Sequence, residues 1–226
     1  MTIEPRTQAR EPMFNAPLLP LLVAASMPVL FFFQLQAWDG AMRWAFRPAE
    51  LMRGEWMGLL TSMLLHGGWT HALMNAVAAL TFGAPVARLM PSGKGALGFL
   101  ALYIVCGVLA ALGYGLLHME SEAPLMGASG AVFGLIGAAT RLMGGRGRLA
   151  PLTDRRVVTA SAAWMGLNVV TGLIGFAPGL DGARIAWEAH AVGFLAGLLL
   201  IGPWLRLFFV PRPAFDSTAR MSDPRA

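Results

Sequence analysis

Six long apolar runs dominate the sequence and constrain its fold more than any other feature. A helix needs about 20 residues to cross a hydrocarbon core about 30 Å thick, and each run has this length or approaches it. Hydrophobic residues make up 56% of the 226 residues and charged residues only 13%, proportions that differ from those of soluble domains. The sequence therefore predicts an all-α fold, a bundle of six transmembrane helices. The runs span residues 18–38, 69–87, 96–117, 129–142, 157–174 and 189–209.

The basic residues predict how the bundle is oriented. If the N-terminus lies in the cytoplasm, 13 of the 17 basic residues fall in cytoplasmic segments, which is the bias expected of a membrane protein. Both termini are then cytoplasmic, and we expect the inner membrane of a bacterium as the location. The same bias accounts for the net charge of +5, so the lipid bilayer is the expected partner and a nucleic acid is not. The four basic residues on the opposite side are Arg43, Arg47, Arg53 and Arg184.

The runs divide the chain into one membrane domain between two polar tails. We expect a cytoplasmic N-terminal tail at 1–16, the six-helix domain at 17–210 and a cytoplasmic C-terminal tail at 211–226. An external loop at 39–68 carries aromatic residues interleaved with arginine and glutamate, a composition typical of the membrane surface. Short interfacial helices and a simple aromatic belt both fit this composition. His66, near the end of the loop, is given no role.

Ser129 lies in a Gly-Ala-Ser-Gly stretch where the fourth run begins. The first N–H groups of a helix have no intrahelical partner, and the helix dipole adds partial positive charge, so this position favours an oxyanion. The flanking Gly127 and Gly130 have no side chain, which allows a substrate backbone to approach the hydroxyl. Ser129 is therefore the candidate nucleophile. Because such stretches are more often packing surfaces between membrane helices, the other polar residues decide the interpretation.

Three further polar residues lie near the depth of Ser129 when each run is counted back from its cytoplasmic arginine at about 1.5 Å per residue. Asn75 and His190 share a layer with Ser129, and His71 lies one turn from Asn75 on the same helix face. A single histidine at this depth would indicate only a hydrogen bond between helices. Polar groups inside a bilayer are costly, so four of them in the outer half of the bundle indicate a function.

These residue types meet the needs of acyl transfer. We expect His190 to act as the general base for Ser129, and Asn75, together with the Ser129 backbone N–H, to bind the tetrahedral oxyanion. His71 is expected to be a further donor to that oxyanion. The apolar runs contain no acidic side chain that could orient His190, which predicts a dyad whose imidazole is held by stacking on Phe133.

Small residues at spacings of three and four predict that the fourth and sixth runs pack closely against each other. Close backbone approach is what a short side chain such as serine needs to reach an imidazole on another helix. The glycines with this spacing are Gly130, Gly134, Gly137, Gly193 and Gly197.

Three motifs occur in an order that resembles the rhomboid intramembrane serine proteases. Residues 71–75 (HALMN) resemble the family's HxxxN motif, residues 127–130 (GASG) its GxSG motif, and residues 189–197 (AHAVGFLAG) its AHxxGxxxG motif. The resemblance extends from about 56 to 202. It implies a six-span helical bundle that cleaves membrane-anchored proteins, and it implies for the serine, the base and the oxyanion donors the roles given above.

The expected function is therefore that of a serine endopeptidase that cleaves single-span membrane proteins and releases their extracytoplasmic part. The alternative is a catalytically inactive rhomboid-like protein that binds transmembrane helices. Such a protein would be expected to have lost Ser129 or His190, and both are present. A His-Glu-x-x-His motif and aspartates within the runs are absent, so zinc and paired-carboxylate mechanisms lack their residues, and we expect no metal or cofactor.

Overall fold

A computed structural model describes residues 16–143, 149–175 and 185–208, and helices joined by loops make up these ranges. The all-α prediction is confirmed, and the long helices begin and end within three residues of the apolar runs. The tails expected at 1–16 and 211–226 lie outside the described residues, apart from Ala16. The long helices are α1 (Leu18–Leu35), α4 (Trp69–Arg88), α5 (Gly93–Leu117), α6 (Ser129–Thr140), α7 (Arg155–Ile174) and α8 (Trp187–Phe208).

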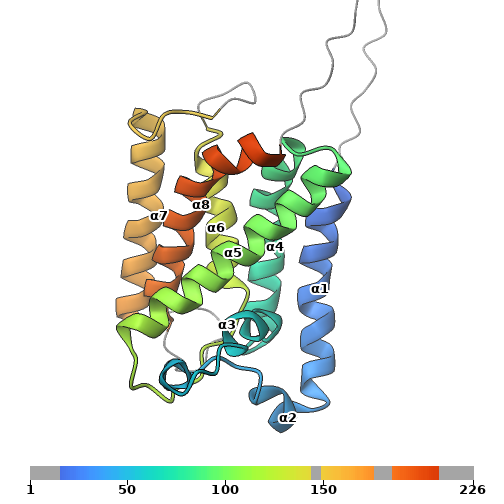
Figure 1. The fold of residues 1–226 in the computed structure, drawn as a ribbon, viewed down its shortest axis with the longest axis vertical. Helices are drawn as coiled ribbons and strands as arrows, with labels where there is room; N and C mark the ends of the chain where they lie inside the picture. The colour runs from blue at the N-terminus through green and yellow to red at the C-terminus, as the bar shows by residue number, and fades with distance from the viewer. Residues whose placement is uncertain (1–15, 144–148, 176–184, 209–226) are drawn as a thin grey trace, which may run out of the picture.

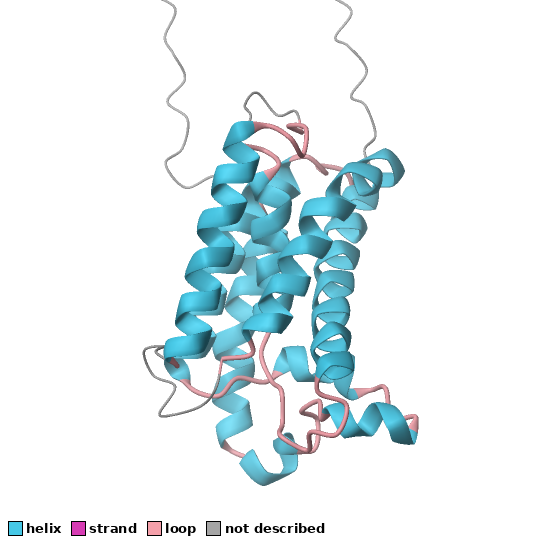
Figure 2. Cartoon of the chain, turned by 90° about the vertical axis from the view of Figure 1, so that its left-hand side faces the viewer, coloured by secondary structure: helices cyan, strands magenta, loops and turns pink. Residues whose placement is uncertain are grey.

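The helix α6 lies at the centre of the bundle. It packs against α8, α5 and α4, while α1 packs against α4 on one side and α7 lies beside α8 on the other (Figure 1). The helix α5 crosses the front of the bundle obliquely (Figure 1). Short helices gather at the lower end in both views, where α6 and α8 begin (Figures 1 and 2). Ser129, the first residue of α6, is therefore placed inside the bundle at this end.

The central helix is too short to cross a membrane by itself. Four helices, α1, α5, α7 and α8, are long and apolar enough to do so, and α4 has 20 residues. With 12 residues, α6 rises only about 18 Å, short of a core about 30 Å thick. Ten of these 12 residues are buried, so the neighbouring helices shield α6 from lipid. The chain is a multi-pass membrane protein built around a short buried helix.

The segment between α1 and α4 is attached to the loop that leads into α6. Phe46, which is fully buried, pairs with Leu125 through two backbone hydrogen bonds of 3.0 and 2.7 Å. Further along, the Gly127 N–H donates to the Ser62 carbonyl oxygen at 2.9 Å. These bonds fix the approach of the chain to Ser129. The segment itself contains α2 (Trp38–Met42), η1 (Pro48–Arg53), α3 (Gly58–Thr61) and η2 (Ser62–Leu64).

Two side-chain links hold the same segment against the bundle. The buried Gln34 of α1 donates to the His66 carbonyl oxygen at 2.8 Å and accepts from the His66 N–H at 2.9 Å. Arg53 donates to Glu122 at 2.9 Å, and this hydrogen bond lowers the pKa of the Glu122 carboxyl from its ordinary value. Because the ion pair is exposed, it adds little to stability, and the buried amide of Gln34 is the stronger link.

Glycines bring α6 and α8 into backbone contact. A Cβ atom added to Gly193 would collide with the backbone oxygen of Gly130, and one added to Gly197 would collide with that of Gly134. A side chain at Gly193 or Gly197 would therefore push α6 and α8 apart. The contact therefore fixes the register between the start of α6 and the start of α8.

We predict that Gly197→Ala destabilises the bundle by about 1–3 kcal/mol or more, the usual cost of overpacking a close contact. Its new methyl group would meet the Gly134 backbone, which cannot move independently of α6. Gly166→Ala on α7 is the matched control, since a Cβ there meets nothing within 4 Å. Thermal unfolding in detergent micelles should show a lower midpoint for Gly197→Ala only. Equal midpoints for the two variants would contradict this account of the α6–α8 contact.

Candidate active site

The hydroxyl of Ser129 lies within hydrogen-bond distance of a histidine on another helix. The Ser129 Oγ atom is 2.8 Å from Nε2 of His190, which belongs to the first turns of α8. The two residues are 61 positions apart in the chain, and the glycine contacts between α6 and α8 bring them together. An imidazole nitrogen at this distance can accept the hydroxyl proton and so turn the serine into a nucleophile.

The imidazole of His190 lies flat on the ring of Phe133. The ring centroids are 4.3 Å apart and the planes differ by 5°. Phe133 follows Ser129 by four residues on α6, so its ring lies one turn further along the same helix face. The stack restricts rotation of the imidazole out of this plane and leaves both ring nitrogens free to form hydrogen bonds.

The second nitrogen of His190 has a partner that the sequence analysis did not single out. His190 Nδ1 is 3.0 Å from the side-chain oxygen of Asn168 on α7. The expectation that stacking alone orients the ring is therefore incomplete, because a neutral amide occupies the place where an acidic residue was sought. The available signal was an amide inside the run 157–174, since polar groups in membrane helices are costly.

His71 lies against the turn that precedes α6. Gly127 in this turn has a φ of +127°, and a Cβ atom there would lie 2.7 Å from His71 Cε1 and 2.9 Å from Nε2. The Gly67 N–H donates to His71 Nδ1 at 3.3 Å, so the proton of the neutral ring is on Nε2. His71 thus directs an N–H toward Gly127, next to Ser129. Glycine at 127 serves both the positive φ and the close approach.

Asn75 lies one turn beyond His71 on α4. It is 6% exposed, and its side-chain Nδ2 forms no hydrogen bond within the described part of the chain. An unpaired buried donor is costly in the resting protein. An acceptor brought in by a bound molecule would remove that cost.

His66, which was given no role, is fully buried next to His71. The two ring centroids are 5.2 Å apart. Burial lowers the pKa of His66 to about 3, with His71 as a smaller cause, so the ring is neutral at physiological pH. Its two nitrogens have no hydrogen-bond partner among the described residues. Only its backbone is tied to the bundle, by the Gln34 amide.

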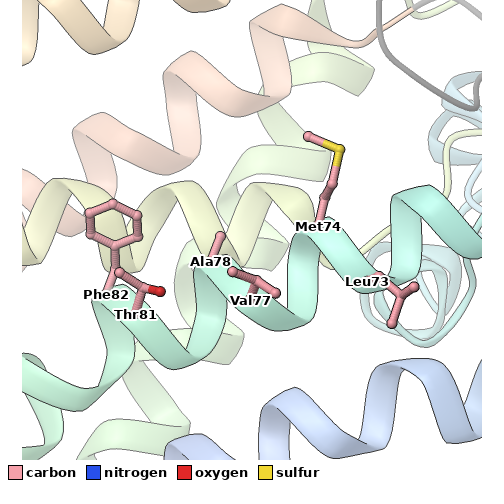
Figure 3. A pocket seen from close by; sticks show the side chains of 6 residues that line it. All are labelled: Leu73, Met74, Val77, Ala78, Thr81 and Phe82. Atoms are coloured by element: carbon pink, nitrogen blue, oxygen red, sulfur yellow. The ribbon is translucent and has the colours of Figure 1, made fainter.

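A hollow of about 390 Å³ lies along α4 and is lined by residues of this helix (Figure 3). Phe82, at one end of it, packs edge-to-face on Trp164 of α7, with ring centroids 5.4 Å apart. The hollow is therefore on α4, the helix that carries His71 and Asn75, and one end of it is close to α7. Its lining residues are Leu73, Met74, Val77, Ala78, Thr81 and Phe82.

A metal centre has no support within the described ranges, where no group of three or more histidine, cysteine, aspartate or glutamate side chains is suited to hold an ion. The cysteine of the chain, Cys106, is fully buried in α5 against Gly134. The polar residues that come together are thus a serine, histidines and amides.

A family model described as the rhomboid domain matches residues 53–206. The chain belongs to the rhomboid family. The match begins at the last residue of η1, covers α3, η2 and α4 to α7, and ends two residues before the end of α8. It includes every residue of the candidate site.

Individual relatives agree with this assignment over shorter stretches. The chain is 33% identical over 120 residues to rhomboid protease GluP of Bacillus subtilis, covering 50% of this chain and 22% of that protein. It is 35% identical over 88 residues to putative rhomboid protease YdcA of the same organism, covering 37% and 40%. It is 30% identical over 155 residues to RHOMBOID-like protein 5 of Arabidopsis thaliana, covering 65% and 43%. The matches thus span less than half the length of these relatives.

Proposed function

We propose that the chain is an intramembrane serine endopeptidase in which Ser129 is the nucleophile and His190 the general base. The observation that carries this proposal is the 2.8 Å hydrogen bond between Ser129 Oγ and His190 Nε2, formed inside a bundle of membrane helices. A serine and a histidine so placed are the minimum for nucleophilic attack on a peptide bond. Membership of the rhomboid family and the protease names of two bacterial relatives support the reaction class.

In the proposed reaction, His190 Nε2 takes the Ser129 proton as Oγ attacks the carbonyl carbon of the substrate. The carbonyl π electrons move to oxygen and form a tetrahedral oxyanion. When the C–N bond breaks, the imidazolium returns its proton to the leaving amine, and an acyl-enzyme remains. A water molecule then repeats the sequence and releases the carboxylic acid. The overall reaction consumes one water and needs no metal or cofactor.

We assign the oxyanion site to three donors around the start of α6. The Ser129 backbone N–H is one of the unpaired donors of the first helical turn. Asn75 Nδ2 has no partner in the resting protein, and the His71 ring directs its Nε2–H toward Gly127. Donors that are already oriented toward the developing charge stabilise the transition state without reorganisation. Gly127 leaves space there for the substrate carbonyl.

The proposed substrates are single-span membrane proteins that reach the dyad along the α4 face. The hollow lined by residues from Leu73 to Phe82 offers an apolar surface on the helix that carries the oxyanion donors. We further propose that residues 17–210 form the membrane domain, that both termini are cytoplasmic and that the domain resides in a bacterial inner membrane. In this orientation the lower end of Figure 1 faces the outer side, together with the loop at 39–68.

We predict that Ser129→Ala and His190→Ala each lower the cleavage of a model transmembrane substrate by about 10⁴-fold or more, because either change removes the activated nucleophile. The double variant should be little worse than the single variants, since the two residues act as a unit. Ser26→Ala is the matched control, because among the described residues that hydroxyl bonds only to the Val23 carbonyl oxygen within α1. Cleavage is measured with the purified protein in proteoliposomes.

Labelling with a fluorophosphonate probe tests the same assignment without a substrate. The wild type and Ser26→Ala should be labelled at Ser129, and Ser129→Ala should not be labelled. Cleavage that persists in Ser129→Ala would overturn the proposal. A folded wild type that binds transmembrane helices but neither cleaves nor reacts would support the inactive rhomboid-like alternative.

We predict that cleavage falls in the outer part of the substrate span and follows a small residue such as alanine. Counted from the cytoplasmic arginines, Ser129 lies about 18 Å and His190 about 24 Å from the cytoplasmic side. The dyad therefore lies some 6 to 12 Å below the outer surface of a core about 30 Å thick. The substrate helix must unwind locally to expose its peptide bond, and glycine or proline nearby makes this easier. Mass spectrometry of the two fragments locates the cut.

Replacing the small residue before the cut by phenylalanine should slow cleavage, whereas the same replacement one helical turn toward the cytoplasm serves as the control. A cut in the cytoplasmic half of the span would show that the depth estimate is wrong. Equal rates for the two phenylalanine substrates would show that the site is not narrow.

A further inference from the structure

Most residues of the helix α7 are at least partly exposed, but the amide side chain of Asn168 is buried. Of its 20 residues, only Val157 and Asn168 are buried, and Asn168 is 3% exposed. A polar side chain taken out of water costs free energy unless its hydrogen bonds are replaced. The buried position of Asn168 therefore depends on the partners that it finds on α8.

Both ends of the Asn168 amide have partners, and these define its orientation. Nδ2 donates to the Trp187 carbonyl oxygen at 2.8 Å, which can only accept. The opposite end, 3.0 Å from His190 Nδ1, is therefore the carbonyl oxygen, and it too can only accept. It follows that the proton of neutral His190 is on Nδ1 and that the lone pair of Nε2 faces Ser129.

This tautomer is the one that a general base for Ser129 requires. With the proton on Nε2 instead, the imidazole could not accept the serine proton. The stack on Phe133 fixes the ring plane, but a stack does not distinguish the two nitrogens, whereas a hydrogen bond to one of them does.

Building on the proposed protease function, we propose that Asn168 is a positioning residue for His190, which holds the imidazole in its Nδ1–H tautomer and aligns Nε2 with Ser129. Because Asn168 is carried by α7, it also makes the alignment of the base depend on the docking of α7 against α8. Unlike a carboxylate, the amide brings no charge, so it orients the ring without attracting an extra proton.

Few other ionisable groups lie near His190 among the residues that the structure describes. His71 of α4 lies against Gly127, and Glu188 at the start of α8 is 3.4 Å from His118 at the end of α5. The helix α6 carries no acidic or basic side chain, and the arginines of α7 are at its opposite end. A carboxylate introduced at 168 would thus act on His190 with little competition from other charges.

The test compares Asn168→Leu, Asn168→Asp and the control Thr171→Val, with kcat, KM and the pH dependence of kcat as readouts. Leucine keeps the size of the side chain and removes both hydrogen bonds. Aspartate keeps the acceptor for His190 Nδ1 and adds a negative charge. The Thr171 hydroxyl, one turn further along α7, bonds only to the carbonyl oxygens of Leu167 and Asn168 in its own helix, within the part of the chain that the structure describes.

We expect Asn168→Leu to lower kcat by at least about 100-fold with little change in KM, because the wrong tautomer becomes populated. Asn168→Asp should keep kcat within about tenfold of the wild type at alkaline pH. Its acid limb should move to higher pH by about one unit or more, since a nearby negative charge favours the imidazolium. Thr171→Val should match the wild type in all three readouts.

A folded Asn168→Leu variant with wild-type kcat would overturn the proposal, as would an Asn168→Asp variant whose acid limb does not move. If the leucine variant does not fold, the near-isosteric aspartate variant decides by its pH profile. The Ser129→Ala variant separates this inference from the protease proposal. Its continued activity would refute the protease function, whereas its inactivity beside a fully active Asn168→Leu would refute only the role of Asn168.

Discussion

The backbone contact between α6 and α8 is the interaction on which the rest of the molecule depends. Serine has one of the shortest polar side chains, so its hydroxyl reaches an imidazole on another helix only if the two backbones nearly touch. The pairs Gly130 with Gly193 and Gly134 with Gly197 provide this approach over successive turns. The same contact buries α6 on the side of α8, and α5 and α4 then complete its enclosure. The packing of α6 against α8 and the hydrogen bond between Ser129 and His190 therefore both depend on these glycines.

Much of this arrangement could be predicted from the sequence, because the length of an apolar run gives the length of a membrane helix and polar residues stand out within such a run. The apolar runs predict the ends of the long helices to within three residues, because charged or turn-forming residues bound each run. Ser129 and His190 were matched in depth by counting along each helix, and the structure brings their side chains into hydrogen-bond contact. The count works because an α-helix has a fixed rise per residue and the hydrocarbon core has a fixed thickness.

The contribution of α7 could not be predicted in the same way. Asn168 lies 22 residues before His190, and their contact depends on how α7 is rotated about its own axis and how it sits against α8. A helix with only two buried residues has almost no hydrophobic periodicity from which this rotation can be inferred. The lack of acidic residues in the apolar runs predicts that His190 has no hydrogen-bonding partner besides Ser129, although an amide oxygen can also accept from an imidazole N–H.

Burial of unpaired polar groups gives the site its character. Asn75 Nδ2 and the ring of His66 lack hydrogen-bond partners among the described residues, and each such group costs folding free energy. Two further buried side-chain atoms without a hydrogen-bond partner, His118 Nε2 and Ser161 Oγ, lie elsewhere in the described bundle. In the proposed reaction, the substrate carbonyl would supply an acceptor for Asn75 Nδ2 and so remove the cost of its burial.

The shortness of α6 has a consequence for how the protein is made. A 12-residue helix cannot remain stably across a bilayer alone, yet the helix that covers one of its faces, α8, is synthesised after it. During translation the backbone groups at both ends of α6 must be sheltered by α4 and α5 or by the insertion machinery until α8 arrives. In the proposed enzyme, Ser129 and His190 can therefore come together only after α8 has been synthesised, so that a chain that still lacks α8 has no dyad.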